Sequence, residues 1–73
     1  MDSFGDTIRN LREMRGWTQK DLAERSGIHP RTVFVIEDGG GTTMATAVSL
    51  AAAFDLPLWK IIKDAEQAEV SHV

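Results

Sequence analysis

The sequence predicts an all-α fold, a compact bundle of five short helices. Apolar residues recur at helical spacing in five segments, with polar residues in the gaps. Glycine or proline separates each segment from the next. No segment shows the period-two alternation of apolar and polar residues that is typical of strands. Because the connections between the segments are short, the helices are expected to pack as one bundle.

Length and composition indicate a single globular domain, spanning residues 1–73. The chain has 73 residues, of which 42% are hydrophobic and 26% are charged. It has no cysteine, and its two histidines, His29 and His72, show no spacing suited to a metal ion. We therefore expect neither a metal nor a cofactor.

Targeting signals are not evident in the sequence. The first six residues lack the basic flank and apolar run of a signal peptide. The longest nearly uncharged stretch, residues 42–54, is too short to span a bilayer. We expect a cytoplasmic protein with no membrane association.

Charge is distributed unevenly along the chain. The net charge is −3, which disfavours strong non-specific binding to nucleic acid. Residues 1–31 carry six basic and five acidic side chains, whereas residues 32–73 carry two basic and six acidic ones. The first half is thus less repelled by phosphates than the second.

The first two helices are expected over residues 4–15 and from Thr18 to about residue 26. Phe4, Ile8 and Leu11 form the apolar face of the first, and Gly16 ends it. Trp17 is expected in the core. Residues 18–21 resemble a capping box with Asp in place of Glu, and the second helix is expected to bury Leu22 and Ala23 before Gly27 ends it.

The third helix is expected to start at Pro30, which suits the first helical position, with His29 as a loop or capping residue. Val33 and Ile36 lie on one face, and Arg31 and Val35 on the opposite face. Residues 38–41 then break the helix.

The last two helices are expected from the N-cap Thr43 to residue 54 and from Pro57 onward. The fourth has a broad apolar face, which we assign to Met44, Ala47, Val48, Ala51 and Phe54. The fifth contains Leu58, Trp59, Ile61 and Ile62. The core is expected to span residues 4–62, and residues 63–73 to form a polar, frayed tail.

The stretch from Gln19 to Ile36 has the signature of a helix-turn-helix. Ala23 supplies a small residue where two helices cross, and Gly27 supplies a left-handed turn residue. The apolar residues that would lock the pair to the body are Leu22, Ile28, Val33 and Ile36. This combination is moderately specific for the motif.

Residues 17–28, WTQKDLAERSGI, resemble the helix-two signature of the Cro and phage-repressor (Xre) family. Residues 32–39 resemble the end of its recognition helix, residues 8–12 its first helix and residues 50–56 its fourth. The resemblance covers residues 4–62. It implies a lambda-repressor-like DNA-binding domain in a transcriptional regulator.

The resemblance also implies site residues, position by position. Residues expected to face base edges in the major groove are Pro30, Arg31, Thr32 and Val35. Residues expected near phosphates are Thr18, Gln19, Gly41, Thr42 and Thr43. Arg12 and Glu37 are expected to form a partly buried ion pair.

The sequence departs from the family pattern at the expected DNA face. The family often has polar residues where this chain has His29, Pro30, Phe34 and Val35, and basic residues in the loop after Gly39. Arg31 remains as a strong base-contacting group, suited to guanine. Weak contacts per monomer favour a homodimer, with Leu58, Trp59 and Ile62 as the candidate interface.

We therefore predict a sequence-specific regulator that binds a two-fold operator of double-stranded DNA as a homodimer. The alternative is a protein-interaction module that keeps the fold and has little DNA binding. The apolar recognition helix and the acidic balance favour this alternative. The carboxylates are scattered and no residue pair has the pattern of a nucleophile and base, so we do not expect an enzyme.

Overall fold

The computed structural model describes residues 3–70, and the side chains of residues 4–66. Within that range it contains five helices and no strand, as the sequence predicts. The helices are α1 (Ser3–Met14), α2 (Gln19–Ser26), α3 (Pro30–Glu37), α4 (Met44–Ala53) and α5 (Leu58–Val70). His72 lies outside the described residues.

The helices end where local hydrogen bonding and backbone conformation favour termination. After α1, Gly16 adopts a left-handed φ of 70°, and the N–H of Trp17 donates to the carbonyl oxygen of Arg12 at 3.1 Å. After α4, Asp55 adopts a φ of 59°, and the N–H of Leu56 donates to the carbonyl oxygen of Ala51 at 3.0 Å. This pattern satisfies carbonyl groups that the helix itself leaves unpaired.

Side chains cap the starts of three helices. Thr18 and Asp21 form the predicted capping box, because each side chain bonds to the other's backbone N–H. His29 caps α3, with its Nδ1 accepting from the N–H of Arg31 at 3.1 Å. Thr43 caps α4 by accepting from the N–H of Thr46 at 3.1 Å. The capping roles predicted for these three segments are confirmed.

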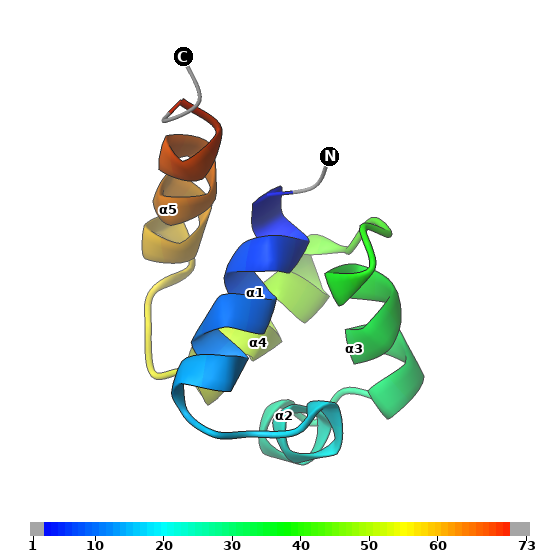
Figure 1. Cartoon of the computed structure of the whole chain (residues 1–73). Helices are drawn as coiled ribbons and strands as arrows, with labels where there is room; N and C mark the ends of the chain where they lie inside the picture. Colours follow the sequence, from blue (N-terminus) through cyan, green and yellow to red (C-terminus); the bar gives the residue numbers. More distant parts are fainter. Residues whose placement is uncertain (1–2, 71–73) are drawn as a thin grey trace.

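All five helices contribute side chains to the core, and α2 lies across the lower end of the bundle (Figure 1). α1 packs against α5 and α3, α2 packs against α3 and α4, and α4 packs against α5. The clustered buried side chains are Ile8, Leu22, Ala23, Val33, Ile36, Leu50, Ala51, Phe54 and Ile61. Trp17 is only half-buried at the edge of this cluster, and its ring stacks on Phe54 at a centroid distance of 5.6 Å.

The α1 and α3 backbones approach each other closely at Gly5. A β-carbon at this position would overlap the carbonyl oxygen of Ile36, near the end of α3. Only glycine permits this approach without a shift of one helix. Gly5 thereby helps to fix the position of α3 against the body of the domain.

The apolar face assigned to α4 was partly wrong. Met44 is 69% exposed and Val48 is 50% exposed. Helix α4 instead turns Ala47, Leu50, Ala51 and the capping Phe54 into the core. The helix carries no charged residue on any side, so its sequence offers little contrast from which to choose the buried face.

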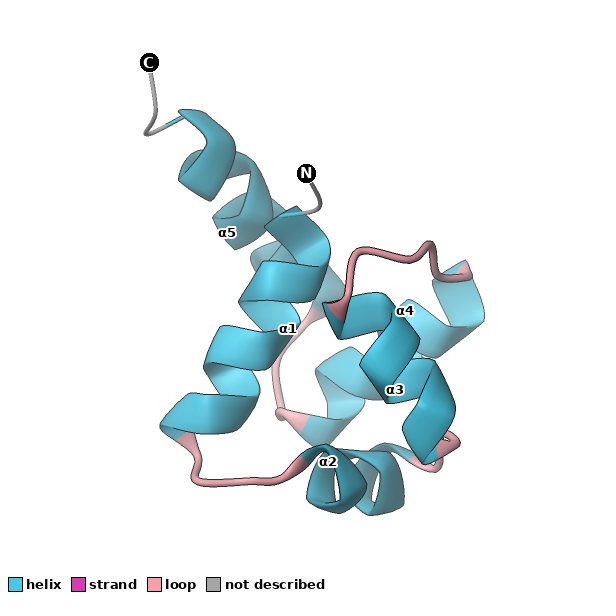
Figure 2. Ribbon diagram, turned by 45° about the vertical axis from the view of Figure 1, so that its right-hand side comes forward, coloured by secondary structure: helices cyan, strands magenta, loops and turns pink. Residues whose placement is uncertain are grey.

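The tail predicted from residue 63 is polar at Lys63, Asp64 and Glu66, but its described part is helical and not frayed. Helix α5 continues to Val70 and extends beyond the other helices (Figure 2). Ala65 is 7% exposed, so the core extends past residue 62. Lys60 and Asp64 form an i,i+4 ion pair at 3.3 Å on the outer side of the helix. Residues 71–73 of the predicted tail lie outside the described range.

No single helix among the described residues is long and apolar enough to cross a membrane. One pair, α4 with residues 58–66 of α5, meets the length and composition test jointly, and it is bent by 99° at its break.

Candidate nucleic-acid interface

Helices α2 and α3 form the helix-turn-helix that the sequence predicts. They are joined by residues 27–29, in which Gly27 has a left-handed φ of 72°. The N–H of Ile28 donates to the carbonyl oxygen of Ala23 at 3.1 Å and closes the turn. Val33 and Ile36, at 0% and 1% exposure, fix the inner face of α3 against the core.

The opposite face of α3 is exposed. Pro30, Arg31, Thr32 and Val35, the residues expected to face DNA bases, are all accessible there. Asp38 follows at the end of the helix and shares this face, because positions 31, 35 and 38 are separated by four and three residues. Asp38 was not identified from the sequence as a site residue, although this spacing was available there.

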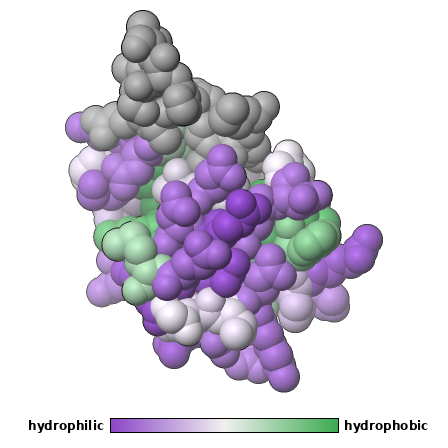
Figure 3. Space-filling view, in the orientation of Figure 1, coloured by the Kyte–Doolittle hydropathy of each residue, from purple (hydrophilic) through white to green (hydrophobic). Residues whose placement is uncertain are grey.

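Apolar side chains also occupy the outer surface of α3. Phe34 is 50% exposed and Val35 is 39% exposed. In Figure 3, hydrophobic atoms gather at the right of the molecule, where Figure 1 places α3, among hydrophilic surroundings. The face thus offers one cation, Arg31, beside groups suited to apolar contact.

The ion pair expected between Arg12 and Glu37 is present, and it is part of a larger network. Glu37 Oε2 accepts from Arg12 Nε at 2.7 Å, and Glu37 Oε1 accepts from Arg12 Nη2 at 3.0 Å. The Glu37 side chain is 1% exposed. Its hydrogen bond raises the pKa of Arg12 above the ordinary value, against the opposing effect of burial. A buried carboxylate is thereby neutralised by an adjacent guanidinium.

Two further residues join Glu37, and neither contact was predicted from the sequence. Arg9 Nη2 donates to the backbone carbonyl oxygen of Glu37 at 2.7 Å, and Gln19 Nε2 donates to Glu37 Oε1 at 3.1 Å. Arg9 precedes Arg12 by three residues, so the two arginines share a face of α1. This spacing was a usable signal, whereas the contact of Gln19 depends on the tertiary arrangement.

The start of α2 combines possible phosphate donors with one fixed negative charge. Gln19 is oriented by Glu37, and its amide nitrogen has a second hydrogen to donate. The carboxylate of Asp21 accepts from the Thr18 backbone N–H at 2.9 Å, and the Thr18 hydroxyl bonds to the backbone of Asp21. The backbone N–H of Thr18, and after it the Thr18 side chain, lower the pKa of the Asp21 carboxyl below its ordinary value of 3.8. The ionised carboxylate offsets part of the attraction of this helix terminus for phosphate.

The loop before α4 is exposed at all three positions expected near phosphate: Gly41, Thr42 and Thr43. The Thr43 hydroxyl is engaged in capping, because it accepts from the N–H of Thr46 and donates to the Thr46 hydroxyl at 3.0 Å. The loop contains no cation. The Thr42 hydroxyl donates to the carbonyl oxygen of Thr43 at 3.3 Å, so a phosphate contact here depends on backbone N–H groups, or on the Thr42 hydroxyl exchanging that bond for one to phosphate.

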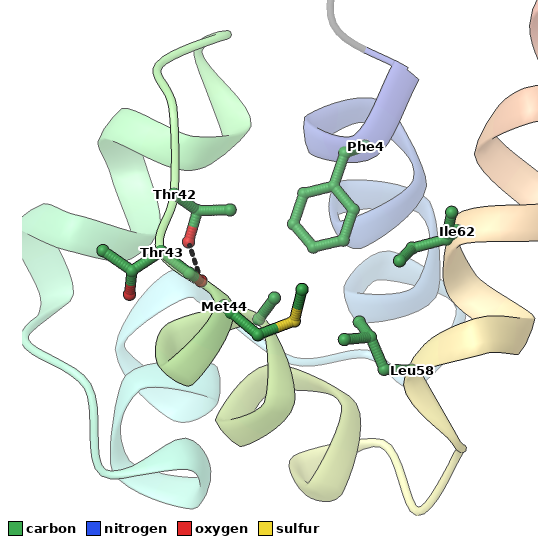
Figure 4. A pocket seen from close by; sticks show the side chains of 7 residues that line it. Phe4, Thr42, Thr43, Met44, Leu58 and Ile62 are labelled. Carbon is green, nitrogen blue, oxygen red and sulfur yellow. Dashed lines mark hydrogen bonds between the residues drawn. The ribbon is translucent and has the colours of Figure 1, made fainter.

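A separate apolar surface runs over α4 and α5. Leu58 and Ile62 line an open groove of about 180 Å³ together with Phe4 and Met44, and Thr42 and Thr43 lie at its edge (Figure 4). Trp59, next to Leu58 on α5, is 64% exposed, and Ile62 is 40% exposed. Leu58 also packs against the domain's own core. The three residues expected at a dimer interface are thus close along one helix and differ in exposure.

Among the described residues, no group of three or more potential ligands is arranged to hold a metal ion.

The helix-turn-helix family model matches residues 8–58, which is more than half of the chain. The protein belongs to the Xre/Cro-type helix-turn-helix family. Its fold is lambda-repressor-like, and the family comprises DNA-binding regulators of transcription.

The relatives that this chain matches in sequence are named as helix-turn-helix regulators of transcription. The HTH-type transcriptional repressor RghR of Bacillus subtilis is 36% identical over 74 residues, covering 99% of this chain and 55% of RghR. A protein of Haloquadratum walsbyi, named as an HTH-type transcriptional regulatory protein, is 37% identical over 65 residues, covering 89% of this chain and 20% of the relative. The chain thus spans about a fifth to a half of the length of these relatives.

Two solved structures share the fold. The restriction-modification controller protein C.AhdI of Aeromonas hydrophila superposes with a TM-score of 0.77 and 30% identity, covering 81% of this chain and 91% of C.AhdI. The clp gene regulator ClgR of Corynebacterium glutamicum superposes with a TM-score of 0.88, covering 97% of this chain and 77% of that structure. At 21% identity, ClgR supports the fold alone.

Proposed function

We propose that this protein is a sequence-specific regulator that binds a two-fold operator of double-stranded DNA as a homodimer. The observation that carries the proposal is the exposed outer face of α3, which the buried Val33 and Ile36 hold away from the core. An exposed second helix of a helix-turn-helix suits the width of the major groove. Such a protein acts in the cytoplasm as a regulator and has no catalytic role.

Base recognition depends on a short set of contacts in this proposal. The Arg31 guanidinium donates to O6 and N7 of a guanine, a pairing that its planar geometry favours. Thr32 and Val35 contact the methyl groups of thymines, and Pro30 limits how closely the start of α3 approaches the base edges. The site is accordingly expected to contain a guanine flanked by thymines.

Phosphate binding positions α3 in the groove. Gln19 donates its second amide hydrogen to a phosphate oxygen, assisted by the Thr18 hydroxyl and by the N-terminus of α2. Backbone N–H groups of Gly41 and Thr43, and the Thr42 hydroxyl, bind a second phosphate. Few cations take part, so binding is expected to depend less steeply on salt than for a basic repressor.

Two weak half-sites become one useful site when they are linked in a symmetric dimer. The candidate interface is Leu58, Trp59 and Ile62, and the partner that fits it is a second copy of this chain. Trp59 supports this assignment because a large aromatic side chain at 64% exposure is a typical interface anchor.

A second candidate function is a protein-interaction module with little DNA binding. The exposed apolar residues Phe34 and Val35 on α3 favour it, as does the net charge of −3. In that case α3 would contact a protein surface in place of DNA.

Selection of duplexes from a random pool, followed by anisotropy titrations at two or more salt concentrations, tests the proposal. We expect one enriched two-fold sequence that binds at least a thousandfold more tightly than unrelated duplexes, the lower end of the usual range for specific sites. An absence of DNA binding at every salt concentration would contradict the proposal and favour the interaction module.

A further inference from the structure

The glycine-rich loop after α3 contacts the side chain at the centre of the proposed base-facing surface. The N–H of Gly40 donates to the carbonyl oxygen of Val35 at 2.8 Å. A β-carbon at Gly40 would overlap Cγ1 of Val35 and would lie 2.9 Å from its carbonyl oxygen. The Val35 methyl group therefore packs directly against the bare backbone of Gly40. At Gly41, by contrast, a β-carbon would meet nothing within 4 Å.

This contact restricts the orientation of Val35. Valine has one side-chain torsion, χ1, with three staggered positions, and branching at Cβ makes it stiff. Because Cγ1 packs against Gly40, χ1 is fixed, and the position of the second methyl group, Cγ2, is fixed with it. Val35 as a whole remains 39% exposed. A side chain at position 40 would displace Cγ1 and turn Val35.

We infer that Gly40 is a positioning residue for base recognition: it holds Val35 in the rotamer that presents a methyl group to the methyl group of one thymine. The inference rests on the proposed binding of DNA through α3. It adds a specificity determinant that makes no contact with a base itself. Glycine is required at position 40 for its lack of a side chain, because φ there is not in the left-handed region.

Replacing thymines by deoxyuridine, one at a time, in a duplex selected by the wild-type protein tests this inference. Uracil differs from thymine only by the methyl group, whose burial is worth ~0.8 kcal/mol, or about fourfold in affinity. We expect about a fourfold loss at one thymine with the wild-type protein, and no loss at that thymine with Val35→Ala. Gly40→Ala should also abolish this discrimination, whereas Met14→Ala, which truncates an exposed side chain outside the proposed DNA-binding surface, is the control and should retain it.

A second readout needs no DNA. Methyl scalar couplings from NMR should report a single Val35 rotamer in the wild type and in Gly41→Ala, and a different or averaged rotamer in Gly40→Ala. If Gly40→Ala does not fold, because its β-carbon also lies 2.9 Å from the Val35 carbonyl oxygen, the wild-type couplings decide alone. An averaged Val35 rotamer in the wild-type protein overturns the inference.

The remaining outcomes separate this inference from the proposed function. If Gly40→Ala weakens binding to every duplex equally and keeps the fourfold discrimination, or keeps the Val35 rotamer, the inference is wrong and the proposed function stands. If the wild-type protein selects no duplex, the proposed function fails at that step and the inference fails with it.

Discussion

The guanidinium of Arg12 and the carboxylate of Glu37 meet in a two-point contact, with Nε–Oε2 and Nη2–Oε1 distances of 2.7 and 3.0 Å. Arg12 lies in the last turn of α1, and Glu37 is the last residue of α3. Arg12 Nη1 also donates to the carbonyl oxygen of Trp17 at 2.8 Å. One side chain of α1 thereby fixes both the end of α3 and the segment that leads into α2.

Removing either member of this pair should destabilise the fold strongly. Arg12→Met leaves the Glu37 carboxylate, whose side chain is 1% exposed, without its main partner. Glu37→Met likewise leaves the Arg12 guanidinium, whose side chain is 13% exposed, without its carboxylate partner. We expect each to lower the free energy of unfolding by about 3–5 kcal/mol, measured by urea denaturation. The double substitution should cost less than the two single costs added together. Strictly additive costs would contradict a direct interaction.

Base and phosphate contacts should respond differently to truncation. Arg31→Ala removes the guanine contact, so we expect it to weaken binding to the selected duplex by about 1–3 kcal/mol and to relax the preference at one base pair. Gln19→Ala should weaken binding to all duplexes by a similar factor, because phosphates carry no sequence information. Both are measured by anisotropy against selected and unrelated duplexes. A folded Arg31→Ala variant with unchanged binding would place the DNA interface elsewhere.

Trp59→Asp should convert the protein to a monomer without unfolding it. The substitution places a charge in the proposed interface, where it cannot be solvated, whereas Trp59 contributes little to the subunit's own core at 64% exposure. Sedimentation equilibrium at high micromolar concentration measures the change. Met14→Asp is the control, because Met14 is 81% exposed at the far end of α1 and lies outside the proposed interface. A wild-type protein that is monomeric at that concentration would exclude this interface.

Local signals made the helices predictable from the sequence. Gly16 and Gly27 adopt the left-handed conformations expected of them, and Thr18 and Asp21 form the expected capping box, because each depends on residues within one turn. Val33 and Ile36 were predictable from their three-residue spacing, which places them on the face of α3 opposite Arg31, although Phe34 and Val35 between them are also apolar. The pairing of Arg12 with Glu37 was available only from the family resemblance.

Features that depend on tertiary packing were not predictable. Helix α4 is uncharged on all sides, so only its contacts with α2 and α5 decide that Leu50 is buried and Val48 is exposed. The contact of Gln19 with Glu37 joins segments whose relative placement no local pattern determines. Helix formation past residue 62, by contrast, was indicated by the sequence, because Lys60 and Asp64 have the i,i+4 spacing of a helical ion pair.

Lowering the pH should destabilise the fold, because protonation of Asp21 removes the charge of the capping box at the start of α2. The pKa of this carboxyl is lowered in the folded chain, first by the backbone N–H of Thr18 and then by its hydroxyl. The ionised group therefore stabilises the fold at pH above its unfolded value of about 3.8, and this contribution is lost as the pH falls through the lower, folded pKa. Asp21→Asn should be less stable than wild type at neutral pH, and the two urea midpoints should converge only as the pH falls below the folded pKa, which is lower than 3.8. A difference independent of pH would rule out this linkage.

Asp55→Gly should stabilise the domain. Asp55 has a φ of 59° directly after α4, where its N–H donates to the carbonyl oxygen of Ala52 at 3.0 Å. An L-residue adopts this left-handed conformation only at a cost of free energy, and glycine adopts it freely. We expect a gain of roughly 0.5–1 kcal/mol, and a rise in melting temperature of about 2–8 °C for a chain of this size. Asp55→Ala is the matched control and should melt below wild type, because alanine lacks the tolerance of Asp for this conformation. An Asp55→Gly variant that melts at or below the wild-type temperature would show that the side chain of Asp55, rather than the backbone conformation, determines stability at this helix end.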